Sequence, residues 1–146
     1  MPSCESVKSV EDGLMACLYD FTGNKCADID KDKLIKTYVT EKIQYPAEKT
    51  GNLAVVFSGY INIPSDGIYT FNLLSDDGSI MKINDEVVIE NDGLHSPADK
   101  TAQKALSKGL HKFELDYFDY YGGVVRLSVI DDNGEKVECS GHWFKH

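Results

Sequence analysis

Two adjacent carboxylates closed by a glycine are the residues of this sequence best placed to do chemistry. The segment Ser75-Asp76-Asp77-Gly78-Ser79 directly follows the apolar run from Ile68 to Leu74. Because Ca²⁺ binds about six to eight oxygen ligands from carboxylates, carbonyls and water, the pattern is typical of a cation-binding loop. The alternative is a plain hairpin turn, in which one Asp bonds nearby backbone N–H groups and Gly78 takes a positive φ.

A second cluster, of aromatic residues, precedes Gly122 and Gly123. Alternation along the strand-like run from His111 places Tyr117 in the core, which leaves Phe118, Tyr120 and Tyr121 as exposed candidates. Aromatic faces stack on the C–H faces of sugar rings, and glycine lets a ligand approach, so these three residues could form a sugar platform. His95, after the turn Asn91-Asp92-Gly93, could border the same pocket or cap its own loop.

Composition excludes several classes of partner. The net charge of −9 and pI near 4.8 argue against nucleic acid, which needs clustered Lys and Arg, and against anionic membrane surfaces. No apolar run is long enough to span a bilayer, so we expect no membrane insertion. The beginning of the chain has no signal-peptide pattern, but the sequence could still be a piece of a secreted protein.

Cysteine spacing leaves the redox state open. Cys4, Cys17, Cys26 and Cys139 allow three complete pairings and contain no Cys-x-x-Cys motif, which disfavours zinc and thioredoxin-like chemistry. Cys17 with Cys26 would close a short loop, and Cys4 with Cys139 would tie the termini together. Buried free thiols are the alternative.

Short strands separated by turns dominate the chain. We expect a lead-in segment over residues 1–12 and a single domain over 13–146. Residues 28–40 and 94–100 read as loops, the former with a short helical turn, whereas Asn84-Asp85 and Asn133-Gly134 predict hairpin turns. The fold class is therefore all-β, an antiparallel sandwich or barrel. Strands are expected at residues 14–21, 53–63, 68–74, 80–83, 86–89, 111–117 and 124–130.

Three motifs in order resemble the PA14 domain family. They are the run from Phe57 to Phe71, which contains Pro64-Ser65-Asp66-Gly67, then Ser75 to Ser79, then Asn91 to His95. The resemblance implies a β-sandwich whose commonest role is non-catalytic. In sugar-binding members, adjacent aspartates joined by a cis peptide coordinate Ca²⁺, which grips vicinal sugar hydroxyls. Asp76 and Asp77 match that pair, and Asp119 matches a later ligand that is usually Asn in adhesins.

The sequence thus predicts a non-catalytic carbohydrate-binding module. The resemblance implies Ca²⁺ as cofactor, a glycan or oligosaccharide and other domains of a larger parent protein as partners, and an extracellular or cell-surface location. The alternative is a structural accessory domain that packs against a neighbouring catalytic domain and has no ligand of its own. We expect no enzyme, because nucleophile-elbow, His-Glu-x-x-His and phosphate-loop motifs are absent from the sequence.

Overall fold

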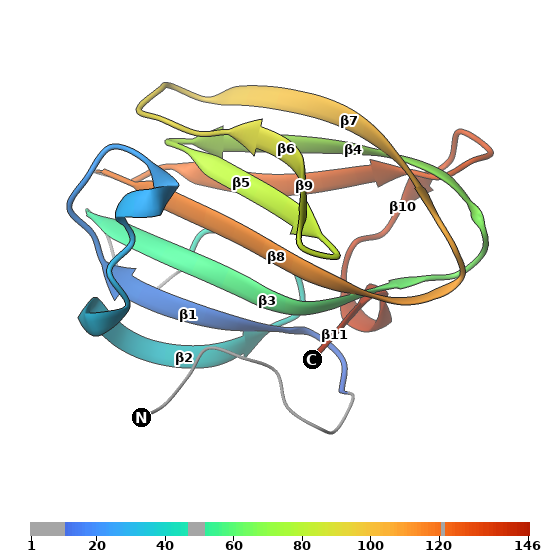
Figure 1. The fold of residues 1–146 in the computed structure, drawn as a ribbon, viewed down its shortest axis with the longest axis horizontal. Coiled ribbons are helices and arrows are strands. Elements are labelled where there is room, and N and C mark those ends of the chain that lie inside the picture. The colour runs from blue at the N-terminus through green and yellow to red at the C-terminus, as the bar shows by residue number, and fades with distance from the viewer. Residues whose placement is uncertain (1–10, 47–51, 121) are drawn as a thin grey trace.

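The computed structural model describes residues 11–46, 52–120 and 122–146, which form two antiparallel sheets packed face to face (Figure 1). The strands are β1 Leu14–Asp20, β2 Leu34–Thr40, β3 Leu53–Ile63, β4 Gly67–Asp76, β5 Ser79–Ile83, β6 Glu86–Asn91, β7 Ala98–Leu106, β8 Gly109–Asp119, β9 Val124–Ile130, β10 Lys136–Val137 and β11 Phe144–Lys145. The short 3-10 turns are η1 Cys26–Asp28, η2 Lys31–Lys33 and η3 Gly141–Trp143. The larger sheet has the order β2-β1-β3-β8-β5-β6, with β11 beside β3, and the smaller has the order β10-β9-β4-β7. The all-β prediction is confirmed, and of its two forms the structure has the sandwich.

Alternating burial along the long strands produces the core. In β3 and β8, which pair from Leu53↔Asp119 to Ile63↔Gly109, side chains of one parity face the second sheet. Phe57 and Leu115 are directly opposite each other in this ladder and are fully buried. Each such side chain stabilises the fold by about 1.5–3 kcal/mol relative to exposure.

Two predicted loops contain strands. Residues 28–40 include not only turns but also β2, and residues 94–100 include the start of β7. Both strands lie at sheet edges and are only partly buried, and Ile35 and Val39 of β2 are exposed. Because β2 has apolar residues on both faces, it lacks the clear alternation of apolar and polar residues from which strands are predicted. The hairpin turns at Asn84-Asp85 and Asn133-Gly134 are confirmed.

The disulfide bonding differs from both pairings that we considered from the sequence. Cys17 forms a disulfide whose partner lies outside the described residues, whereas Cys26 and Cys139 are free thiols. The Cys17–Cys26 and Cys4–Cys139 pairings are therefore wrong. Glu11 and Asp12 are the described residues of the predicted lead-in segment, and their backbones pair with His146 and Lys145 at the other end of the chain.

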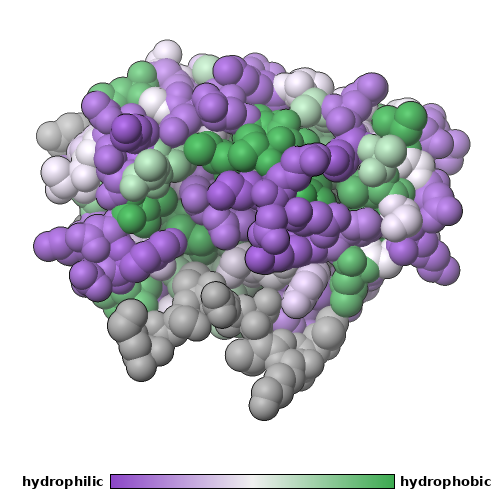
Figure 2. Space-filling view, viewed as in Figure 1, coloured by the Kyte–Doolittle hydropathy of each residue, from purple (hydrophilic) through white to green (hydrophobic). Residues whose placement is uncertain are grey.

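Hydrophilic side chains cover much of the molecular face in Figure 2, with hydrophobic residues between them. Among the described residues, no helix has the length and apolar character needed to cross a bilayer.

Candidate functional site

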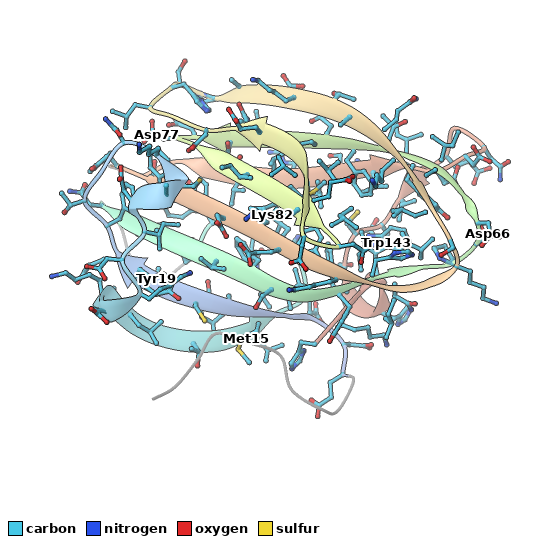
Figure 3. All side chains as sticks on the ribbon, viewed as in Figure 1. Met15, Tyr19, Asp66, Asp77, Lys82 and Trp143 are labelled. Atoms are coloured by element: carbon cyan, nitrogen blue, oxygen red, sulfur yellow. The ribbon has the colours of Figure 1, made fainter. Side chains whose placement is uncertain are left out.

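Three carboxylates meet at one end of the sandwich. Asp76 is the last residue of β4, Asp77 follows it in the turn to β5, and Asp119 is the last residue of β8. The Asp76–Asp77 peptide bond is cis, in agreement with the expectation from the family resemblance. One carboxylate oxygen from each of the three residues lies within 4.8 Å of the other two. Figure 3 labels Asp77 at this end.

Backbone amides from two different loops fix the Asp77 carboxylate. Its Oδ1 accepts a hydrogen bond from the His95 backbone N–H at 3.1 Å, and its Oδ2 accepts one from the Tyr120 N–H at 3.1 Å. The backbone N–H of Asp77 donates to the Phe118 carbonyl at 3.1 Å. Asp77 thus joins the turn after β4 to the end of β8 and to the loop after β6.

Asp119 is the buried member of the group and has an unsatisfied oxygen. Its side chain is fully buried, and its Oδ2 accepts a hydrogen bond from the Tyr45 hydroxyl at 3.0 Å. Among the described residues, nothing donates a hydrogen bond to its Oδ1. Burial raises the pKa of Asp119, as do the charges of Asp77 and Asp76, whereas the Tyr45 hydrogen bond lowers it, and so does the nearby Gly122 backbone, which is not in hydrogen-bonding geometry with Oδ1. Burial and then Asp77 raise the pKa of Asp76, so the carboxylates repel one another.

Gly78 and Gly123 allow the backbone to pack closely around the three carboxylates. A Cβ on Gly123 would lie 2.1 Å from the Asp76 carbonyl oxygen and 2.5 Å from Asp119 Oδ1. A Cβ on Gly78 would lie 2.6 Å from both the Gly93 nitrogen and the Phe118 ring. Real side chains do not tolerate such distances, so both positions need glycine for close approach of the backbone.

A buried polar network supports the base of the Asp-Asp turn. The Ser75 and Ser79 hydroxyls lie 2.6 Å apart across the turn. The Asn91 side-chain amide donates to the carbonyls of Leu73 and Ala98 and to Ser75 Oγ, at 2.9–3.3 Å. Because these groups are buried and satisfied, they hold β4, β6 and β7 in register below the carboxylates. The sequence shows Asn91 only as a turn residue.

The loop from Phe21 to Asp28 forms a further wall that sequence reasoning missed. The Tyr120 hydroxyl accepts from the Gly23 N–H at 2.8 Å and donates to the Gly23 carbonyl at 2.5 Å. Phe21 stacks on Phe118 with ring centroids 4.6 Å apart, and the Cys26 N–H donates to Asp92 Oδ1 at 2.9 Å. No local signal in the sequence links this loop to residues almost one hundred positions later.

The aromatic residues predicted to form an exposed sugar platform lie differently from that expectation where the structure describes them. The prediction that Phe118 is exposed is wrong, because the loop from Phe21 covers it and leaves it fully buried. Tyr120 is half-buried and its hydroxyl is engaged, and Tyr121 lies outside the described residues. The His95 ring nitrogens lie 2.8 Å from the carbonyl oxygens of Ser96 and Asn91, so its ring contacts its own loop.

Comparison with known proteins identifies the family. A family model of the PA14 domain matches residues 10–140. The chain belongs to the PA14 domain family. A search of curated proteins finds no match.

Solved PA14 structures share this fold at low sequence identity. A PA14 sugar-binding domain from an RTX adhesin is 18% identical with a TM-score of 0.77, covering 92% of this chain and 97% of that one. The epithelial adhesin 9 A domain of Candida glabrata, in complex with Galβ1-3GlcNAc, is 17% identical with a TM-score of 0.70, covering 94% and 90%. A β-glucosidase from Kluyveromyces marxianus in complex with glucose is 20% identical with a TM-score of 0.63, covering 82% of this chain and 15% of that one.

Proposed function

We propose that this PA14 domain is a non-catalytic carbohydrate-binding domain that binds Ca²⁺ through Asp76, Asp77 and Asp119, and glycans through that ion. The observation that carries the proposal is the buried, unsatisfied Oδ1 of Asp119 beside the two other carboxylates. A buried polar group without a partner is costly, and converging negative charges add to the cost. A divalent cation at the point of convergence offsets both.

The donor set fits calcium better than a transition metal. All three candidate ligands are carboxylates, which are hard oxygen donors, and the group contains neither histidine nor cysteine. One oxygen from each of the three side chains supplies fewer ligands than the about six to eight that Ca²⁺ takes. Positions therefore remain for backbone carbonyls, water and a pair of sugar hydroxyls. Two backbone amides already orient the Asp77 carboxylate, and the Tyr45 hydroxyl orients that of Asp119.

The relatives support a glycan as the partner. One is named as a sugar-binding domain of an adhesin, and another is a C. glabrata adhesin domain bound to a disaccharide. Adhesins act at cell surfaces, which favours an extracellular or cell-surface location for this chain. The β-glucosidase, in which the matching region is a small part of a longer chain, favours a parent protein with further domains. We include His95 and Tyr121 among the proposed glycan contacts and give Phe118 and Tyr120 internal roles.

Calorimetric titration tests the metal and the sugar separately. We expect the chain to bind Ca²⁺ at millimolar concentration or below, and sugars from a panel of neutral oligosaccharides to bind only when Ca²⁺ is present. Asp76→Asn/Asp77→Asn should abolish both events, since it removes two of the three charged ligands while preserving side-chain size.

A second Asp-Asp pair in the chain provides the matched control. Asp131-Asp132 lies in the turn between β9 and β10, where Asp131 Oδ1 accepts from the backbone N–H groups of Asn133 and Glu135. Asp131→Asn/Asp132→Asn makes the same charge change away from the site and should bind Ca²⁺ as the wild type does. Calcium binding that is absent from the wild type, or equal in the two double variants, contradicts the proposal.

A further inference from the structure

A groove follows the open edge of β9 beside the three carboxylates. It encloses about 400 Å³, and its lining includes Lys42, Tyr45, Val124, Arg126, Lys136 and Glu138. The groove exists because β10 pairs with β9 only at Val129 and Ile130. Among the described residues, the earlier part of β9 therefore has a strand partner on one side alone, namely β4.

Strand register places Arg126 close to the proposed calcium ligands. Val124 lies opposite Asp76, and Arg126 lies opposite Leu74. Val125 and Leu127 are buried, so the alternate residues Val124 and Arg126 point to the outer face, the same face as Asp76. Diagonal neighbours of this kind in a sheet are about 7–8 Å apart, within reach of a long side chain. Arg126 therefore lies about one sugar unit away from the carboxylates.

The charge of the groove is opposite to that of the chain. Arg126 is the only arginine in a chain with a net charge of −9, and its side chain is exposed. Lys42, Lys136 and Arg126 line the groove against a single carboxylate, Glu138. Within the described part of the chain, none of these three cations forms an ion pair. A guanidinium without an internal partner remains available to a ligand.

Tyr45 connects the groove to the calcium site. It lines the groove, and its hydroxyl donates to Asp119 Oδ2. The phenol therefore lies between the acidic candidate site and the basic groove, with its hydroxyl directed at Asp119.

The geometry points to an acidic glycan as the ligand, with Arg126 as the specificity-determining residue. This inference rests on the proposed calcium-dependent function: one sugar unit binds through the ion, and the next places its carboxylate or sulfate group against Arg126. The planar guanidinium forms two parallel hydrogen bonds with such oxyanions, which a lysine ammonium does not match. Lys42 and Lys136 add attraction for the same negative charge.

Paired sugars that differ in an acidic group test the inference. The probes are lactose against lactose sulfated at the galactose O3, and α-1,4-digalactoside against α-1,4-digalacturonide, titrated with Ca²⁺ and with EDTA. In Ca²⁺ we expect the acidic member of at least one pair to bind about tenfold tighter, a difference of about 1.4 kcal/mol. Arg126→Gln should remove that preference while leaving the affinity for Ca²⁺ and for the neutral sugar unchanged.

Lys108→Gln is the matched control, because it removes one positive charge at the Asp66 end of the sandwich, where the Lys108 backbone bonds Asp66. It should retain the acidic preference. If the wild type binds the acidic and the neutral member of each pair equally well, the inference is overturned. Binding of the neutral sugars that depends on Ca²⁺ would, in that case, still support the proposed function. A preference that survives Arg126→Gln, or tighter binding of hexaglutamate than of the acidic sugars, also overturns it. Loss of all calcium and sugar binding in the wild type identifies failure of the proposed function itself.

Discussion

Gly123 imposes the narrowest steric constraint on the candidate calcium site. Gly123→Ala would place a methyl group 2.1 Å from the Asp76 carbonyl oxygen and 2.5 Å from Asp119 Oδ1, so the β4 and β8 ends must separate. We expect the Ca²⁺ affinity measured by calorimetry to fall at least about tenfold, as ligand geometry is lost. Gly134→Ala is the control: its φ of 80° also disfavours alanine, but its Cβ meets nothing within 4 Å. If both variants keep wild-type affinity, the close packing at Gly123 does not support the site.

Residue chemistry alone does not distinguish the two Asp-Asp pairs of the chain. Asp131-Asp132 is also followed by a nearby glycine, yet the Asp131 carboxylate caps its own turn. Asp76-Asp77 differs because Asp119 arrives beside it from a strand more than forty positions later. The order of motifs around Ser75–Ser79 predicted this pair through the family resemblance. The partnership of Asp119 with Tyr45 is a tertiary contact with no local pattern.

At the scale of elements, alternation predicted the direction of the β8 side chains but not their environment. Tyr117 faces the core as expected, and Phe118 faces the other side of the sheet. That side is not open at Phe118, because Phe21 and Cys26 pack over it. Burial therefore depends on where the irregular loop after β1 lies, and hydrophobic periodicity carries no information about that.

Tyr120 couples this loop to the candidate calcium site. Its backbone N–H holds Asp77 and its hydroxyl holds both backbone groups of Gly23. Tyr120→Phe keeps the ring and the backbone bond but removes the hydroxyl. We expect amide hydrogen exchange at Gly23 to accelerate at least about tenfold, since the opening free energy of this loop falls, while Ca²⁺ affinity changes little.

Tyr60→Phe provides the comparison, because Tyr60 lies on β3, where it pairs with Lys145 of β11 rather than with a residue of the candidate calcium site. Amide hydrogen exchange at Gly23 in Tyr60→Phe should match that in the wild type. Unchanged exchange in Tyr120→Phe would show that the loop is held by its other contacts, the Phe21–Phe118 stacking and the Cys26–Asp92 hydrogen bond, and not by the Tyr120 hydroxyl.

At the scale of the whole molecule, the sequence predicted the long paired strands and their turns well, whereas the edges and the covering loops required the structure. β3 and β8 alternate clearly because one face of each is buried along its whole length. The edge strands β2 and β7 lack that constraint and were read as loops. Asp116 lies on the outer face of the large sheet and is only partly exposed, although alternation predicts a wet position for it.

Asp116 makes the stability of the whole domain depend on pH. Burial, then the neighbouring Glu114, raises its pKa from 3.8 to about 7, although Lys31 and Lys82 act in the opposite direction. The folded state thus binds the Asp116 proton more tightly than the unfolded state does. This contribution to stability is fully present below the unfolded pKa of 3.8 and is lost progressively as the pH rises from there through about 7.

Asp116→Asn removes this dependence without changing side-chain size. In urea unfolding with EDTA at pH 8.5, we expect the variant to be more stable than the wild type by about 1–2 kcal/mol, because one pKa unit corresponds to about 1.4 kcal/mol and partial exposure reduces the effect. At pH 3, below the pKa of 3.8 that Asp116 has in the unfolded chain, the two proteins should differ little, since Asp116 is then protonated in both the folded and the unfolded wild type. Asp132→Asn, at an exposed turn position, should follow the wild type at both values. A variant that is less stable than the wild type at pH 8.5 would mean that the Asp116 carboxylate is stabilised as an anion, by Lys31 and Lys82, and that burial is the weaker effect.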